Sequence, residues 1–155
     1  MAYTAVPTQN TGDSWSAANH NTYIKDNFAF CQRTPIEIEI FGPTTNTSTG
    51  DGKKNFFVPA KLNGMNLVSA VAYVITAGTT NTTDIQINNV TDGVDMLSTK
   101  LTIDSAETSS ATAAVPVVID TAHDDVATGD RLRFDVDAVS TTPAQGLIIV
   151  LEFSF

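Results

Sequence analysis

The sequence predicts an all-β domain, an antiparallel β-sandwich or jelly roll of about eight strands, and three observations support this. Short segments alternate between apolar and polar residues, which is the period of a half-buried strand. Turn-forming residues separate these segments at spacings of roughly 8–15 residues, with no helical period between them. Hydrophobic residues make up 42% of the 155 positions and charged residues 16%, so the chain can bury a core.

The most apolar segment is Asn66–Ala77, with the sequence NLVSAVAYVITA. Neither side of it carries a charge, so we expect it to be covered on both faces in the middle of a sheet. A helix is the alternative, but Val71 and Val74 are β-branched and lose side-chain freedom in a helix. Gly64 and Gly78 also punctuate the segment at both ends. A strand is therefore the better interpretation.

The chain before the strands predicts an extended arm followed by one helix. Residues 1–12 are polar and form the arm. Within Gly12–Phe30, Asp13 or Ser16 can cap the helix, because a short side-chain oxygen accepts from free backbone amides. Its apolar face at helical spacing consists of Ala17, Ile24, Phe28 and Cys31, with His20 beside them. We expect this face to dock on the sandwich, on a neighbouring copy or on another protein.

Thr34-Pro35 ends the helix, and the other strands follow in order. The expected strands are Ile36–Ile40, Asn55–Ala60, Asp84–Asn88, Leu97–Ile103, Val115–Ile119, Arg131–Ala138 and Leu147–Phe155. Pro59 places the second of these at an end or an edge, because proline donates no ladder hydrogen bond. We divide the chain into an N-terminal arm and helix, residues 1–33, and a β-sandwich domain, residues 34–155.

The net charge of −9 is unevenly distributed. Residues 1–64 hold five basic and five acidic residues, whereas residues 65–155 hold three basic and twelve acidic residues. An acidic body repels phosphate, which argues against a nucleic-acid partner. No run of about 18 apolar residues predicts a membrane span. The N-terminus also lacks the basic and apolar regions of a signal peptide, so we expect synthesis in a cytoplasm.

The sequence offers little catalytic chemistry. His20 and His123 have no second ligand at metal spacing, and Cys31 is the single cysteine, so no intrachain disulfide can form. No nucleophile elbow, P-loop or dinucleotide fingerprint occurs, and we expect neither an enzyme nor a cofactor. The acidic loop Asp120–Asp130 leaves one metal alternative open, because carboxylates can gather around calcium. The residues of this candidate calcium loop are Asp120, Asp124, Asp125 and Asp130.

Residues Gly12–Asn27, GDSWSAANHNTYIKDN, resemble the GDxWTAxxxNTYIRDN segment near the N-terminus of many tailed-bacteriophage virion proteins. Lys25 stands where arginine is common, which leaves the charge unchanged. The stretches Val58–Leu67, Val90–Leu97 and residues 129–155 look like small phage β-sandwich domains. The resemblance implies a virion component, such as a head decoration protein, a head fibre or a tail-associated fibre, and such proteins are often trimers.

The sequence therefore predicts a non-enzymatic virion structural protein, a capsid decoration protein made in the host cytoplasm and released by lysis. Its arm and helix would bind the major capsid protein, another virion protein or a sister subunit. The expected partner-binding residues are Trp15, Ala17, His20, Tyr23, Ile24, Phe28 and Phe30. The alternative is a receptor- or glycan-binding module of a fibre or tail tip. A hydrolase on a jelly-roll scaffold would require acids that converge in a cleft.

Overall fold

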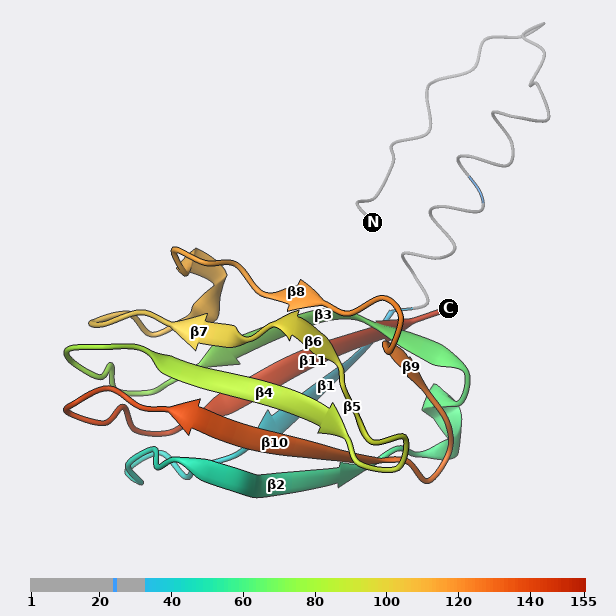
Figure 1. The fold of residues 1–155 in the computed structure, drawn as a ribbon, viewed down its shortest axis with the longest axis horizontal. Coiled ribbons are helices and arrows are strands. Elements are labelled where there is room, and N and C mark those ends of the chain that lie inside the picture. Colours follow the sequence, from blue (N-terminus) through green and yellow to red (C-terminus); the bar gives the residue numbers. More distant parts are fainter. Residues whose placement is uncertain (1–23, 25–32) are drawn as a thin grey trace, which may run out of the picture.

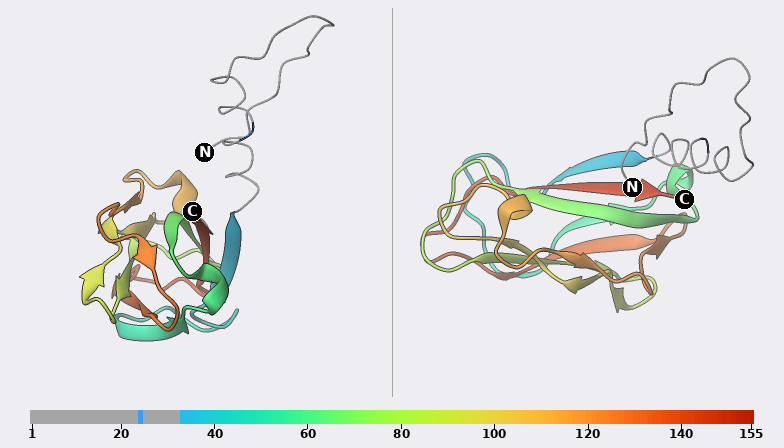
Figure 2. Two further views of the ribbon diagram at one scale, coloured as in Figure 1. Left: turned by 90° about the vertical axis from the view of Figure 1, so that its right-hand side faces the viewer. Right: turned by 90° about the horizontal axis from the view of Figure 1, so that it is seen from above.

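The computed structural model describes Ile24 and residues 33–155. Apart from Ile24 and Arg33, the arm and helix predicted for residues 1–33 lie outside the described residues. The described chain confirms the predicted all-β class: antiparallel strands form two main sheets that face each other as a sandwich (Figures 1 and 2).

Three sheets make up the domain. The first contains, in order, β1 (Thr34–Glu39), β11 (Ile148–Ser154), β3 (Met65–Tyr73) and β9 (Asp125–Val126). The second contains, in order, β2 (Gly50–Phe57), β10 (Arg131–Ala138), β4 (Thr83–Asn89) and β5 (Val94–Asp95), and β7 (Leu101–Ile103) also pairs with β4. The small third sheet pairs β6 (Leu97–Thr99) with β8 (Val118–Ile119), and two short 3-10 turns are η2 (Ala60–Leu62) and η3 (Ser110–Thr112).

The core lies between the two main sheets and is built from the predicted apolar stripes. In β11, Ile149, Leu151 and Phe153 are fully buried, and Leu132 and Phe134 of β10 face them from the second sheet. Alternate residues of a strand point to opposite faces, so each stripe enters the core as a set. Burying one such side chain contributes roughly 1.5–3 kcal/mol. Phe155, which continues the stripe in the sequence, is 68% exposed because it follows the end of β11.

The expectation that both faces of the central segment are covered is wrong for this chain. Strand β3 does lie inside its sheet, with Leu67, Ala70 and Ala72 in the core. On its other face, Val68 is 38% and Tyr73 is 42% exposed. The reason is that an antiparallel sheet in a two-layer sandwich has one inner face and leaves the other open. The strand also ends at Tyr73, and the next residue, Val74, bonds instead to Thr108.

Further boundaries differ from the sequence prediction: β2 begins at Gly50 instead of Asn55, and β8 keeps only Val118–Ile119 of the expected Val115–Ile119. Segment 97–103 breaks at Lys100, since β6 joins the third sheet and β7 the second. Pro59 follows β2 and precedes η2, although β2 is an edge strand as expected. The acidic loop 120–130 contains a short strand, β9, which pairs with the start of β3.

The two ends of the sandwich differ in character. Thr34 pairs with Phe153, so the chain enters β1 at the end where β11 finishes, and Figure 1 shows the C-terminus beside that entry. We call this the terminus end. The opposite end, the loop end, consists of residues 40–49, 74–82, 104–113 and 139–147, which connect the strands there. The loop end therefore lies at the opposite end of the sandwich from the point where the chain enters β1.

Gly146 shows how tightly the loop end packs. Its φ of +72° is costly for any residue with a Cβ, and an added Cβ would lie 2.5 Å from Ile75 Cγ1 and 3.1 Å from Pro43 Cα. Gly93 has nearly the same φ, +73°, but no atom within 4 Å of such a Cβ. The pair therefore separates backbone strain from close packing.

We expect Gly146→Ala to lower the free energy of unfolding by about 2–5 kcal/mol, the sum of a left-handed conformation and overpacking. Gly93→Ala should lose only about 1–2 kcal/mol, from the conformation alone. Urea denaturation followed by far-UV circular dichroism measures both values. Equal losses in the two variants would show that the loop end is not tightly packed at Gly146.

Candidate functional site

The partner-binding residues predicted from the sequence fall almost wholly outside the described chain. Ile24 is the described member, and its side chain is 54% exposed. The others, Trp15, Ala17, His20, Tyr23, Phe28 and Phe30, lie outside the described residues, as does Cys31. Among the described residues, the candidate surfaces are the acidic loop, the outer faces of the two sheets and the loop end.

The four aspartates of the candidate calcium loop serve separate roles. Asp120 accepts from Ala122 N at 3.1 Å and lies 2.8 Å from His123 Nδ1. Asp130 is buried and accepts from Asn89 Nδ2 at 3.1 Å and from Ala127 N at 2.8 Å, which closes the turn before β10. Asp124 is buried, whereas Asp125 is exposed on β9. Within the described chain, no group of three or more acidic, His or Cys side chains gathers at metal-ligand distance.

Electrostatics distinguish two of these acids. The hydrogen bond from His123, together with that from the Ala122 amide, lowers the pKa of Asp120. Burial raises the pKa of Asp124, and the neighbouring charges of Asp125 and Asp120 add to that rise. Asp120 therefore supports a turn as a carboxylate, whereas a charge on Asp124 opposes folding.

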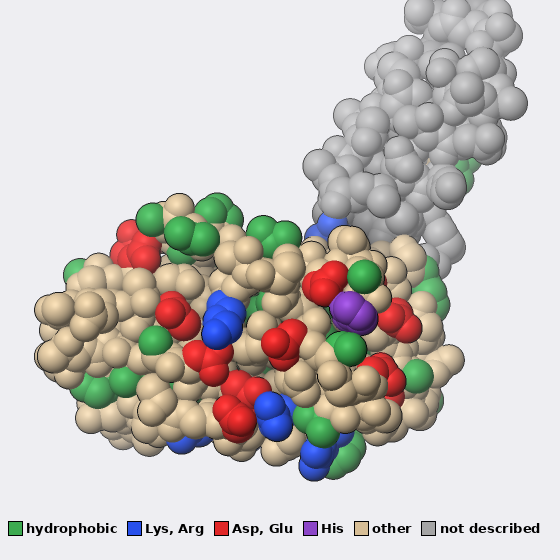
Figure 3. Space-filling model, viewed as in Figure 1, with side chains coloured by type: hydrophobic (Ala, Val, Ile, Leu, Met, Phe, Trp, Pro, Cys, Tyr) green, Lys and Arg blue, Asp and Glu red, His purple; other side chains and the backbone are tan. Residues whose placement is uncertain are grey.

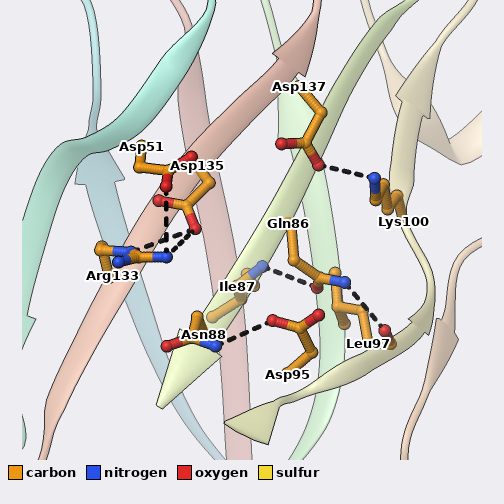
Figure 4. Close-up of polar contacts among 10 residues, drawn as sticks. All are labelled: Asp51, Gln86, Ile87, Asn88, Asp95, Leu97, Lys100, Arg133, Asp135 and Asp137. Carbon is orange, nitrogen blue, oxygen red and sulfur yellow. Dashed lines mark hydrogen bonds and ion pairs between the residues drawn. The ribbon is translucent and has the colours of Figure 1, made fainter. Parts of the chain in front are cut away.

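The outer face of the second sheet carries a network of charged and polar side chains that bond to one another (Figures 3 and 4). Asp135 is buried and accepts from Arg133 Nη2 at 2.7 Å and from Gly52 N at 2.7 Å. Arg133 Nη2 also lies 3.8 Å from an Asp51 oxygen, and its bond to Asp135 raises the pKa of Arg133. A carboxylate with these donors is held in one place.

Further polar pairs, separate from this cluster, lie beside it and link β10 to Lys100 and β4 to β5 and β6. Lys100 Nζ lies 2.7 Å from Asp137, and this hydrogen bond raises the pKa of Lys100. Asn88 Nδ2 donates to Asp95 at 2.8 Å, while the buried Gln86 donates to the Leu97 carbonyl at 3.0 Å. Because these groups already bond within the domain, a ligand would have to break those bonds. This face suits solvation better than recognition.

The outer face of the first sheet has the opposite character. In the strand register, Val150 of β11 lies between Glu37 and Val71, and Ile148 lies between Glu39 and Tyr73. The apolar face, as we name it, consists of Val68, Val71, Tyr73, Ile148 and Val150. Val71, Ile148 and Val150 are half-buried by their neighbours, whereas Val68 and Tyr73 are exposed. Such a surface gains free energy when another apolar surface covers it.

The loop end forms a third surface, rich in hydroxyl and amide groups. Across its four connections, Asp104 and Glu107 are the only charged residues. Thr80 and Asn81 have φ values of +57° and +65°, which is unusual for residues with side chains, above all for β-branched threonine. Ser105 Oγ accepts from Thr80 N at 2.7 Å, and Asn81 Nδ2 donates to Thr141 Oγ1 at 3.0 Å. The surrounding hydroxyls therefore hold a strained turn at this tip.

Comparison with known proteins identifies no relative: no family model, no curated protein and no solved structure matches the chain. Among the described residues there is no pocket. No helix of the described chain is both long enough and apolar enough to cross a membrane.

Sequence reasoning identified neither the apolar face nor the loop end as a surface. A signal for the apolar face is present in the sequence, because both sides of Asn66–Ala77 are apolar, but the same pattern predicts a strand buried on both faces. The loop end brings together four polar connections that are far apart in the sequence, and their convergence depends on the sheet topology.

We expect Asp124→Asn to raise the melting temperature at pH 7 by roughly 1–4 °C, because it removes a charge that burial disfavours. A raised folded-state pKa stabilises the fold fully below the unfolded pKa of about 3.9 and loses this effect as pH rises through the folded pKa. The gain should therefore shrink as the pH falls to 3. Calorimetry at both pH values measures it, with Asp125→Asn, an exposed neighbour, as the control. A gain of equal size at pH 3 and pH 7 would exclude this cause.

Proposed function

We propose that the protein is a non-enzymatic structural component of a bacteriophage virion, a capsid decoration protein attached through its N-terminal arm and helix. The observation that carries the proposal is the polarity of the domain. The chain enters β1 at the terminus end, while the loop end lies at the far side of the sandwich. A domain tethered at one end and displaying the other suits an accessory protein that projects from a surface. The phage-like segment Gly12–Asn27 precedes this entry point.

Charge distribution supports the same orientation. The twelve acidic residues of 65–155 give the body its net negative charge, whereas residues 1–64 are neutral. A neutral arm can approach another protein without the repulsion that the acidic body would meet. The partner in this proposal is the major capsid protein or another virion protein, and the protein is a homo-oligomer located in the virion.

The sandwich contains its own core, formed between strands that all lie within residues 34–155. Attachment and folding can therefore be tested separately. We expect deletion of residues 1–32 to abolish co-sedimentation with particles that lack the protein, while the circular dichroism spectrum of the sandwich is kept. The deletion leaves Arg33 and its ion pair with Glu152 in place.

Val115→Ser is the control variant, since Val115 is an exposed apolar residue outside residues 1–32. It should sediment with particles as the full-length chain does. Undiminished co-sedimentation of the deleted chain would rule out the anchor.

The loop end favours a second candidate, a receptor- or glycan-binding module. Its surface consists largely of uncharged hydroxyl and amide groups, which can donate to and accept from sugar hydroxyls. The strained turn Thr80-Asn81 is fixed by neighbouring side chains, which would reduce the entropy lost on binding. This candidate and the decoration protein differ in where the partner binds.

If the loop end binds a glycan, the chain should bind host cells or polysaccharide saturably. Asn81→Ala should weaken binding by at least about tenfold, because it removes the hydrogen bond to Thr141 that holds the turn in place. Asn55→Ala, an exposed change on β2, should leave binding unchanged. A glycan array and a cell-binding assay provide the measurements. If both are blank for the unmodified chain, this candidate fails.

A further inference from the structure

Within the described part of the chain, the apolar face of the first sheet has no cover. Val68 and Tyr73 are 38% and 42% exposed, and Ile75, just beyond β3, is 58% exposed. The residues beside them in the register, Val71 and Val150, point away from the core as well. A contiguous apolar surface on a sheet face that looks outward marks a site where another apolar surface binds.

The chain itself supplies a segment that fits this face. Residues 1–32 precede β1, which is the edge strand of the same sheet. Arg33 forms an ion pair with Glu152, whose place in the register is on the outer side of β11. The segment therefore leaves the domain at the border of the apolar face. A helix over residues 16–31 would be about 24 Å long, close to the roughly 30 Å of the nine-residue β3.

The segment also has an apolar surface that needs a cover. Its predicted face contains Ala17, Ile24, Phe28 and Cys31 at helical spacing. In the single chain, the Ile24 side chain of this face is 54% exposed, and Val68 and Tyr73 of the apolar face are exposed as well. We propose that the segment of one copy docks on the apolar face of a second copy, and that this exchange closes copies of the chain into a ring.

Charge and symmetry favour this occupant over a face-to-face pair. The apolar face is bordered by Glu37 and Glu39 of β1 and by Glu152 of β11, so stacking two such faces would bring like charges together. A segment that docks on the next copy makes a head-to-tail contact, which closes into a ring when the rotation between copies allows it and extends into a filament when it does not. In the helix that the sequence predicts, Trp15 and Tyr23 would lie off the docking face, and the arm precedes it. These residues would remain available to contact the particle. The docking between copies therefore does not depend on the proposed attachment to a particle.

The first test is a directed disulfide between two differently tagged chains, each carrying Cys31→Ser. One chain carries Ile24→Cys and the other Val71→Cys, and the two are co-expressed and oxidised. We expect a covalent pair that contains both tags on a non-reducing gel. Val118→Cys, at an exposed residue of β8, replaces Val71→Cys in the control and should give at least tenfold less of the pair. A chain that carries both Ile24→Cys and Val71→Cys should give covalent oligomers.

Two outcomes of this test overturn the proposal. An internal disulfide in the doubly substituted chain, with no covalent oligomer, would show that the segment docks on its own domain. Absence of the disulfide in both formats would show that the segment does not reach the apolar face.

The second test measures mass by light scattering after size exclusion. The full-length chain should form a closed oligomer, and both deletion of residues 1–32 and Val71→Asp should reduce the mass to that of one chain. Val71 points outward, so Val71→Asp should keep the far-UV spectrum of the fold. A monomeric full-length chain, or a Val71→Asp variant that keeps the full oligomeric mass, overturns the proposal. Particle binding is not measured here, so failure of the attachment and failure of this inference can be distinguished.

Discussion

The first sheet depends on the position of its last strand, because β11 lies between β1 and β3 and bonds to both. Thr34 and Phe153 pair at one end of β1, and Leu151 faces Ala70 of β3. The sheet is therefore complete only when the last residues of the chain lie between segments that precede them by about 80 and 115 positions. Pairing over such distances makes folding slow, because a long loop must close before its contacts form. The core stripe Ile149, Leu151 and Phe153 compensates through burial.

This arrangement gives each main sheet one inner face and one outer face, and the two outer faces differ. The second sheet presents acids and bases that already bond to each other, such as Arg133 with Asp135 and Lys100 with Asp137. The partly exposed pair of Lys100 and Asp137 contributes little to stability but keeps the surface hydrated, whereas the buried carboxylate of Asp135 is held in place by its donors. The first sheet presents the aliphatic and aromatic side chains of the apolar face, with Glu37, Glu39 and Glu152 at its border. Of the two outer faces, only the apolar face of the first sheet gains free energy when another surface covers it.

The proposed roles use different parts of one polar molecule. The chain enters the domain at the terminus end. The apolar face of the first sheet would bind the N-terminal segment of another copy, and the loop end lies opposite the terminus end. An exchanged segment would place the arms of neighbouring copies side by side, which would raise the effective concentration of the second arm after the first has bound. In this arrangement Ala17, Ile24 and Phe28 of the expected partner-binding set would contact the second copy, and oligomerisation and attachment would reinforce each other.

The sequence by itself determined the class of the fold and its strongest strands, because alternation of apolar and polar residues is a local property. The stripes of β10 and β11 followed from that period, whereas the choice of edge for β2 came from the sheet topology, because Pro59 lies beyond the end of that strand. Tertiary structure alone decided which side of β3 meets the core, why 97–103 breaks at Lys100 and how β9 arises in an acidic loop. Each of these depends on a strand partner distant in the chain. The apolar face likewise exists only because two distant strands align Val71 with Val150, and no local pattern specifies that register.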